Sequence, residues 1–212
     1  MLLKLVLLLT NRSVKKFMSP RTPKQNEQIR KERISEILAA ALYTFSKNGY
    51  HASSIAAIAK KAGVSKGLMY NYFESKEEVL KVLLTDLFES VIKTMELNET
   101  PFTDERLIRF IEDTFSIVGS NRAYWKLYFS LVVQPEVTDI SKELMLPKII
   151  PFIESLTHYF AEKGHNNPTA YLRYFLASLD GAKIQFLLDE ENFQLHTIKT
   201  YLINEFTRDV SN

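Results

Sequence analysis

Apolar residues recur with the period of a helix along most of the chain from residue 27 onward. In the first such stretch they fall every three or four positions, along one face of a helix with 3.6 residues per turn. Asn48-Gly49 follows this stretch, and glycine readily adopts the left-handed conformation beyond a helix end. The pattern therefore predicts a helix over 27–48. Its apolar face consists of Ile34, Ile37, Leu38, Ala41, Leu42 and Phe45.

Two short helices are predicted next. Ser53-Ser54 offers an N-cap for a helix that runs through Ala62. Ser65 is placed to cap a still shorter one, from Lys66 to about Phe73. A helix of about two turns is not stable alone, so the second must pack against its neighbours.

The remaining pattern is also helical. The capping box Ser75-Lys76-Glu77-Glu78 begins a long helix, with serine at the N-cap and glutamate three residues on. Six glycines and seven prolines in 212 residues also favour long helices. We expect an all-α fold of about nine helices without a convincing strand. The later ones are predicted from Thr103 or Asp104, from Asn121 to near Pro135, from near Pro147 and Pro151 to Lys163, over 168–188, and over about 193–208.

The turn Ala62-Gly63-Val64 joins the two short helices and predicts a helix-turn-helix, an arrangement that binds DNA. In the second helix Val64, Met69 and Phe73 can face the core, which leaves the tip over 65–71 pointing outward. We expect this tip to enter the major groove, where base edges differ for all four pairs.

Individual side chains of the tip suit particular contacts. Lys66 is a donor for guanine, Asn71 can pair with adenine, and Leu68 can touch a thymine methyl group. Hydroxyls and helix N-termini suit phosphates. Taken singly, Lys66 also fits a solvated lysine, and Tyr70 and Tyr72 fit ordinary packing residues. The residues expected at the DNA are Ser54, Ser65, Lys66, Gly67, Leu68, Tyr70, Asn71, Tyr72 and Lys76.

The stretch from Ser53 to Glu78 resembles the DNA-binding domain of the TetR family of bacterial transcriptional regulators, and the resemblance extends over about 29–85. It implies phosphate contacts by Ser54, Tyr72 and Lys76, major-groove contacts from 65–71, and Tyr70 close to the DNA. Two positions depart from the family. Leu68 stands where a small hydroxyl residue is frequent, and Ala56 where some members carry a long polar side chain. These departures leave the operator sequence open.

Charge divides the chain. Residues 1–85 carry 15 lysines and arginines against 6 acidic residues, a balance of +9, whereas 86–212 carry 12 against 19, a balance of −7. The basic part suits a polyanion. We therefore expect a tail and basic arm over 1–26, a helix-turn-helix domain over 27–85 and a helical ligand-binding and dimerisation domain over 86–212. For Arg21 and Lys24 two interpretations stay open: a flexible arm on DNA or a solvated helix start.

The first ten residues, MLLKLVLLLT, are too few to span a bilayer, and no cleavage site of small residues follows them. We expect Met18 rather than Met1 to be the natural start, with a short tail as the alternative, and no membrane partner. The chain has no cysteine, which suits the cytoplasm and excludes thiolate metal sites. Neither a metal-binding histidine spacing nor a catalytic motif occurs. We expect no enzyme activity, cofactor or metal.

The aromatic residues point to a ligand. Seventeen of the 25 lie after residue 100, and they can line an apolar cavity or form a solid core. The residues expected at a ligand are Tyr124, Trp125, Tyr128, Phe152, Tyr159 and Tyr174; Gln134, His158 and Gln185 are candidates to orient it.

The helix predicted over 168–188 has two faces suited to burial, and the side chains of one face are small around Gly181. A helix that is buried on two sides can pack on its own core and on a partner chain. The sequence therefore predicts a C2 dimer formed by this helix and the last one. The resemblance implies a regulator, expected to be a repressor, that binds a palindromic operator as a homodimer and is released by a small lipophilic or aromatic effector. The alternative is a DNA-binding protein of the same fold without effector response.

Overall fold

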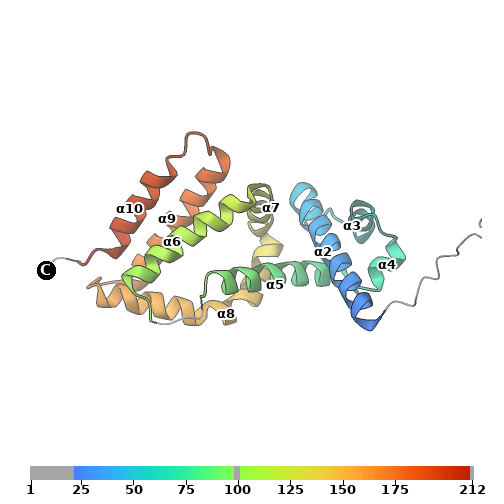
Figure 1. The fold of residues 1–212 in the computed structure, drawn as a ribbon, viewed down its shortest axis with the longest axis horizontal. Helices are drawn as coiled ribbons and strands as arrows, with labels where there is room; N and C mark the ends of the chain where they lie inside the picture. Colours follow the sequence, from blue (N-terminus) through green and yellow to red (C-terminus); the bar gives the residue numbers. More distant parts are fainter. Residues whose placement is uncertain (1–21, 98–100, 211–212) are drawn as a thin grey trace, which may run out of the picture. The chain divides into compact units, whose positions relative to one another are not determined.

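The computed structural model describes residues 22–97 and 101–210, and within these ranges it has nine helices and no strand (Figure 1). The predicted all-α fold is confirmed. The apolar first ten residues, Met18 and Arg21 lie outside the described residues. The chain divides into two compact units, one that ends at Glu36 and one that begins at Ile37.

Helix α2 runs from Pro23 to Asn48, four residues earlier than predicted. Thr22 and Gln25 form the reciprocal bonds of a capping box: each side-chain oxygen accepts a hydrogen bond from the other residue's backbone N–H, at 3.2 and 2.9 Å. Residues 23–26 of the basic arm are helical, and Lys24 lies in the first turn of α2, as the interpretation as a helix start predicts. The buried face of α2 begins at Ile37 and ends at Phe45.

Three helices follow the turn after α2: α3 (Ile55–Ala62), α4 (Lys66–Tyr70) and α5 (Lys76–Thr94). Their predicted caps are confirmed, because Ser54, Ser65 and Ser75 each accept a hydrogen bond from the backbone N–H three residues on. Helix α4 ends earlier than predicted. The carboxylate of Glu78 accepts from the N–H of Glu74 rather than from that of Ser75, so the capping box is shifted by one residue.

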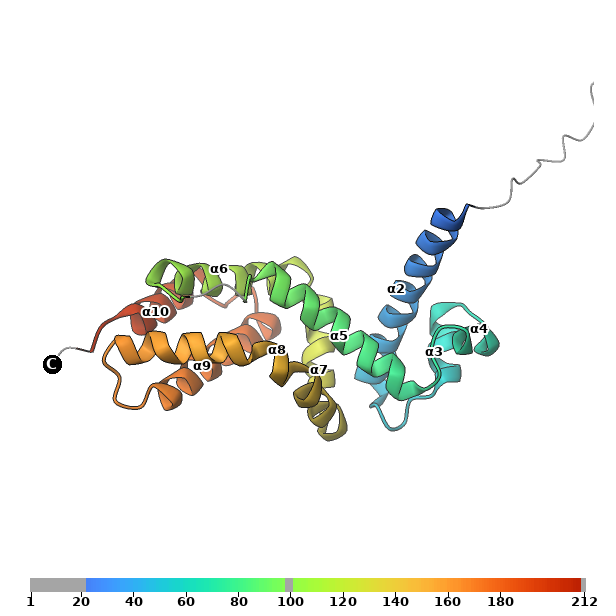
Figure 2. The same cartoon turned by 90° about the horizontal axis from the view of Figure 1, so that it is seen from below.

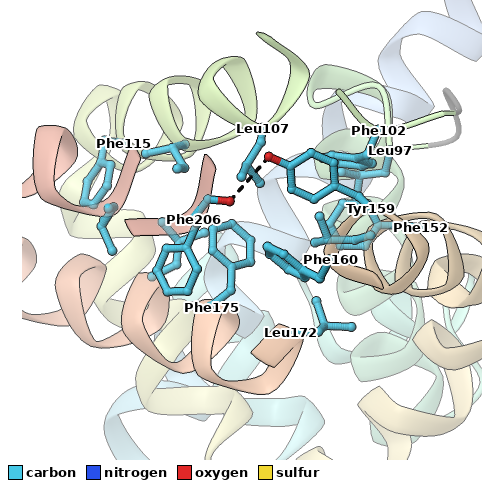
Figure 3. Packing of buried hydrophobic residues seen from close by; sticks show 14 of the residues in the cluster. Leu97, Phe102, Leu107, Phe115, Phe152, Tyr159, Phe160, Leu172, Phe175 and Phe206 are labelled. Carbon is cyan, nitrogen blue, oxygen red and sulfur yellow. Dashed lines mark hydrogen bonds between the residues drawn. The ribbon is translucent and has the colours of Figure 1, made fainter. Parts of the chain in front are cut away.

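Five helices form the remaining part: α6 (Asp104–Ser120), α7 (Arg122–Val132), α8 (Pro135–Glu162), α9 (Pro168–Leu188) and α10 (Leu195–Thr207). Helix α8 packs along α9, and α10 packs on α6 and α9 (Figure 2). Their shared core is rich in aromatic rings, with Phe160, Phe175 and Phe206 almost fully buried (Figure 3). Edge-to-face ring pairs of this kind stabilise a core beyond the area that they bury.

Helix α8 corrects one prediction. We expected a helix to start near Pro147 or Pro151, but α8 is continuous from Pro135 and contains both. An interior proline removes one backbone hydrogen bond and frees the carbonyl four residues earlier. Pro147 and Pro151, and Glu143 whose carbonyl is freed, all lie on the exposed face of α8, where water can reach the unpaired groups. The helix therefore continues through them.

Membrane crossing requires a helix that is both long and strongly apolar. None of the helices α2–α10 meets these requirements.

Candidate nucleic-acid interface and apolar cavity

The turn between α3 and α4 depends on Gly63. Its φ is +68°, in the left-handed region that favours glycine. Its backbone N–H bonds to carbonyls of the last turn of α3, and the N–H of Val64 bonds to the carbonyl of Ala59 at 3.0 Å. These bonds end α3 and turn the chain into α4.

Helix α4 separates a buried side from an exposed tip. Met69 is fully buried, and Phe73, just beyond the helix, is nearly so. Lys66, Tyr70 and Asn71 are exposed, with 51% of Tyr70 accessible. The predicted division between core and tip is confirmed. Leu68 and Tyr72 are half-buried at its margin.

Gly67 lies in the exposed tip with open space around it. A Cβ built on Gly67 would meet no atom within 4 Å. Packing of the described residues therefore does not require glycine here. A surface helix position without such a requirement favours alanine, so packing does not account for the glycine, and the close approach of DNA to this backbone stays a prediction.

Lys76 has a structural role that the sequence did not predict. Its Nζ donates to the carbonyls of Tyr50, His51 and Ser53 at 2.8, 3.1 and 3.1 Å. An ammonium group has three N–H donors, so all of them are engaged in closing the turn before α3. The phosphate contact predicted for Lys76 stays a prediction, and it requires the ammonium to give up one of these carbonyls.

An apolar cavity of about 400 Å³ lies among α5, α6, α7, α8 and α9. Of the residues predicted at a ligand, Trp125, Tyr128 and Phe152 line it. Trp125 is the single tryptophan of the chain, and its Nε1 donates to the carbonyl of Ile117 at 3.0 Å. The volume is within the range of small-molecule sites, about 300–1,000 Å³.

The other three predicted residues lie elsewhere. Tyr124 lines a neighbouring hollow that it shares with Trp125. Tyr159 is buried, and its hydroxyl donates to Asp104 at 2.8 Å and lies 3.4 Å from the carbonyl oxygen of Phe206 (Figure 3). Tyr174 is half exposed on α9.

Burial raises the pKa of the Tyr124 phenol to about 12, with a smaller contribution from Asp86. Burial also raises the pKa of Tyr128, and the negative charge of Asp180 adds to this effect. Both hydroxyls are therefore protonated near neutral pH and can donate hydrogen bonds.

The cavity lining also contains three polar residues that the sequence analysis missed: Thr114, Asp180 and Lys183. Lys183 Nζ lies 2.6 Å from Asp180 Oδ1, one turn earlier on α9. The spacing of three residues on one helix was the available signal, but it could not indicate that the pair borders a cavity.

Gln134 lies outside the cavity lining and instead contacts the helix-turn-helix region. Its Oε1 accepts from the N–H of Tyr50 at 2.7 Å, and its Nε2 donates to the carbonyl of Phe45 at 3.2 Å. Ser46 Oγ donates to the carbonyl of Leu127 at 2.7 Å. These bonds join the end of α2 to helix α7 and the start of α8.

The helix-turn-helix region of this chain is similar to a known protein family. Residues 37–83 match the family model of bacterial regulatory proteins, tetR family. This segment contains the end of α2, the turn at Gly63, all of α4 and the start of α5. The N-terminal helices of this chain are therefore similar to the corresponding part of tetR-family regulators.

Two curated relatives are similar over about half of the chain. The fatty acid metabolism regulator protein of Bacillus subtilis is 32% identical over 111 residues, 51% of this chain and 55% of the relative. The transcriptional activator FasR of Mycolicibacterium smegmatis is 31% identical over 116 residues, 53% of each chain. The chain thus aligns with little more than half the length of these curated relatives. Both are named as regulators rather than enzymes.

A solved structure extends the similarity to the fold of almost the whole chain. The regulator FadR of Bacillus subtilis, in complex with stearoyl-CoA, superimposes with a TM-score of 0.66 over 84% of this chain and 99% of that one, at 21% identity. The likeness establishes a TetR-type helical fold.

Proposed function

We propose that this protein is a ligand-responsive transcriptional regulator that binds a palindromic DNA operator as a homodimer in the cytoplasm and is released by a small lipophilic effector. The observation that carries the proposal is the tip of α4. Lys66, Tyr70 and Asn71 are exposed there around Gly67, while Met69 anchors the helix in the core. Donors and an open backbone on one short helix suit the major groove.

The apolar cavity supports an effector. A space of about 400 Å³ lined by Trp125, Tyr128 and Phe152 is large enough for a small lipophilic molecule. The related Bacillus subtilis FadR holds stearoyl-CoA, and fatty acid metabolism appears in the name of a curated relative. We therefore favour effectors that carry a fatty-acyl chain or a similar apolar body.

Exposed apolar residues on α9 and α10 support a dimer. Large hydrophobic side chains face solvent on both helices: Tyr174, Ile184 and Leu188 on α9 and Tyr201 on α10, with Leu188 70% and Tyr201 65% exposed. A Cβ on Gly181 would meet no atom within 4 Å, so another helix can approach its backbone closely. A C2 pair would present two α4 tips to the half-sites of a palindrome.

Coupling between cavity and DNA would pass through α7. Trp125, Tyr128 and Phe129 of α7 line the cavity, and the carbonyl of Leu127 bonds to Ser46 of α2. A ligand that shifts α7 would therefore disturb the end of α2 and the turn after it. By thermodynamic linkage, such an effector binds the DNA-incompetent state more tightly, and DNA weakens effector binding equally.

The first test measures DNA binding by fluorescence anisotropy, with the full chain and duplexes from the region upstream of its own gene. We expect selective binding whose affinity falls steeply with salt. Lys66→Ala and Asn71→Ala should each weaken it by about 1–3 kcal/mol and relax base preference. Lys126→Ala, an exposed lysine of α7, is the control. Equal binding by all four proteins would refute the assignment of the α4 tip.

A second candidate function, a DNA-binding protein without effector response, is favoured only if the cavity stays empty in the active protein. Titration of effector candidates against the protein–DNA complex separates the two.

A further inference from the structure

The charged groups of the cavity lie together at one place in its lining. Among the residues that the structure describes, Asp180 and Lys183 are the only charged side chains that line the cavity, and they occupy one turn of α9. Most of the remaining lining is aliphatic or aromatic. A ligand that fills this space therefore meets an apolar surface over most of its length and a charged pair at one position.

The two charged partners differ in burial. The side chain of Lys183 is 17% exposed, whereas that of Asp180 is 59% exposed. Lys183 therefore has the more buried side chain of the two. The Phe129 ring, another part of the lining, has its centroid 5.7 Å from the Lys183 Nζ. A desolvated cation gains most from an additional charged acceptor.

The ammonium retains donors for such an acceptor. Lysine has three N–H donors, and within the described ranges the hydrogen-bond and ion-pair partner of Lys183 is Asp180. Two other polar groups in the lining bond to backbone carbonyls, Thr114 Oγ1 to Phe110 at 2.7 Å and Trp125 Nε1 to Ile117 at 3.0 Å. Tyr128 also lines the cavity, but its hydroxyl is a neutral donor. Lys183 is thus the charged donor best placed to orient a ligand.

The same chain shows that a lysine of similar exposure can hold two carboxylates. Lys163, with a side chain 15% exposed, lies 2.8 Å from Asp104 Oδ1 and 3.1 Å from Asp209 Oδ1. Binding of a second carboxylate by Lys183 therefore would not require the loss of Asp180.

We propose that the cavity binds an amphiphile with an apolar body and one carboxylate head, and that Lys183 binds this head while Asp180 remains its partner on the solvent side. The inference rests on the proposed function of the cavity as the effector site. It predicts opposite effects for the two charged residues: loss of Lys183 weakens binding of the anion, and loss of Asp180 strengthens it by removing a competing negative charge.

The test uses Trp125 as an internal fluorescent reporter of the cavity. The probes are decanoate, 1-decanol and decylamine, which share a ten-carbon chain and differ in the charge of the head group. Each is titrated into the wild-type protein and into Lys183→Met, Asp180→Asn and Lys199→Met. Lys199 is a matched control, since it is 19% exposed and paired with Glu112 but lies outside the cavity lining. Thermal unfolding verifies that every variant is folded.

We expect the wild type to prefer decanoate over both other probes. Lys183→Met should lose about tenfold or more in decanoate affinity, since a hydrogen bond between charged groups is lost, and should keep its affinity for 1-decanol. Asp180→Asn should bind decanoate more tightly, and Lys199→Met should behave as wild type.

Two other outcomes have distinct meanings. Equal binding of decanoate and 1-decanol, unchanged in Lys183→Met, would leave the cavity as an effector site but overturn the anionic head. Absence of binding by all three probes to the wild type would refute the cavity as a lipophilic site and this inference with it. Weaker decanoate binding in both Lys183→Met and Asp180→Asn would mean that the pair only supports the structure of α9, which also overturns the inference.

Discussion

The side-chain oxygen of Gln134 accepts a hydrogen bond from the backbone N–H of Tyr50 at 2.7 Å, although 84 residues separate them in the chain. Gln134 lies at the N-cap of α8, directly after the helix that borders the cavity. Tyr50 lies in the turn between α2 and α3. The pair therefore joins the proposed effector site to the helix-turn-helix region through a single side chain.

Replacement of this side chain is expected to reduce the coupling. Gln134→Ala leaves the Tyr50 N–H without its acceptor, at a cost of about 1–3 kcal/mol in the free energy of unfolding. The ratio of DNA affinities with and without effector, typically 5–150-fold in coupled systems, should fall toward one. Anisotropy titrations measure this ratio. Gln194→Ala is the control, because Gln194 is exposed and makes no capping bond. An unchanged ratio in Gln134→Ala would show that the bond between Gln134 and Tyr50 does not carry the coupling and would leave the Ser46–Leu127 bond as the link.

Gly67→Ala should separate stability from DNA binding. Alanine favours a helix by up to about 1 kcal/mol over glycine, and the added methyl group has open space in the free protein. We expect the melting temperature to rise or stay equal. The free energy of operator binding should become less favourable by about 1–3 kcal/mol, the usual cost of one disturbed contact. Gly119→Ala serves as the control, because Gly119 is an exposed position of α6 where an added Cβ would make only an ordinary 3.7 Å contact with Phe186. Undiminished DNA binding would show that the DNA does not approach this backbone.

Tyr201→Glu should dissociate the proposed dimer. A charge in the middle of an apolar interface loses its hydration without a partner, and Tyr201 is 65% exposed in the single chain. Sedimentation velocity should give a dimer for the wild type and a monomer for the variant. The control is Leu146→Glu, since Leu146 is also exposed but lies on α8. If Tyr201→Glu sediments as the wild type does, the interface lies elsewhere.

Asp104 is expected to contribute stability that depends on pH. Burial acts to raise its pKa, but hydrogen bonds from Lys163 and Tyr159 outweigh this and hold the pKa below its ordinary value of 3.8. A carboxyl group with a depressed folded-state pKa stabilises the protein above its unfolded pKa, and this contribution is lost as the pH falls through the folded value. The melting temperature of Asp104→Asn should therefore lie below that of the wild type near neutral pH, and the gap should narrow below pH 3.8.

The control for this measurement is Asp139→Asn. Asp139 is 83% exposed and lies 3.9 Å from Lys142 on the same helix, a geometry of small energetic effect. Its melting curves should follow those of the wild type at every pH. If the difference in melting temperature between the wild type and Asp104→Asn stays constant from neutral pH down to the acid range, the ion pair of Asp104 is not the cause of that difference.

Local signals made much of the helix-turn-helix part predictable. Ser54 and Ser65 are caps because a short hydroxyl side chain can satisfy an N–H of the first helical turn, and Gly63 ends α3 because few other residues adopt its backbone angle. The contrast between Met69 and Tyr70 follows from helical periodicity alone. These features depend on residues a few positions apart.

The features that sequence analysis missed depend on long-range packing. Pro147 suggested a helix start, but its position on the exposed face of α8 makes an interior proline tolerable. Gln134 was predicted to contact a ligand, but its side chain bonds to Tyr50. Lys183 was not predicted at a ligand, because only the packing of α7 and α9 around one cavity brings it to the lining. Nothing local in the sequence indicates which distant element a polar side chain meets.

The most direct test of the account titrates effector candidates into the preformed protein–DNA complex while anisotropy reports the DNA and Trp125 fluorescence reports the cavity. The account predicts that DNA is released over the concentration range in which Trp125 fluorescence changes, and that added operator shifts the fluorescence titration to higher ligand concentration. A full Trp125 response with the DNA still bound at unchanged affinity would contradict it.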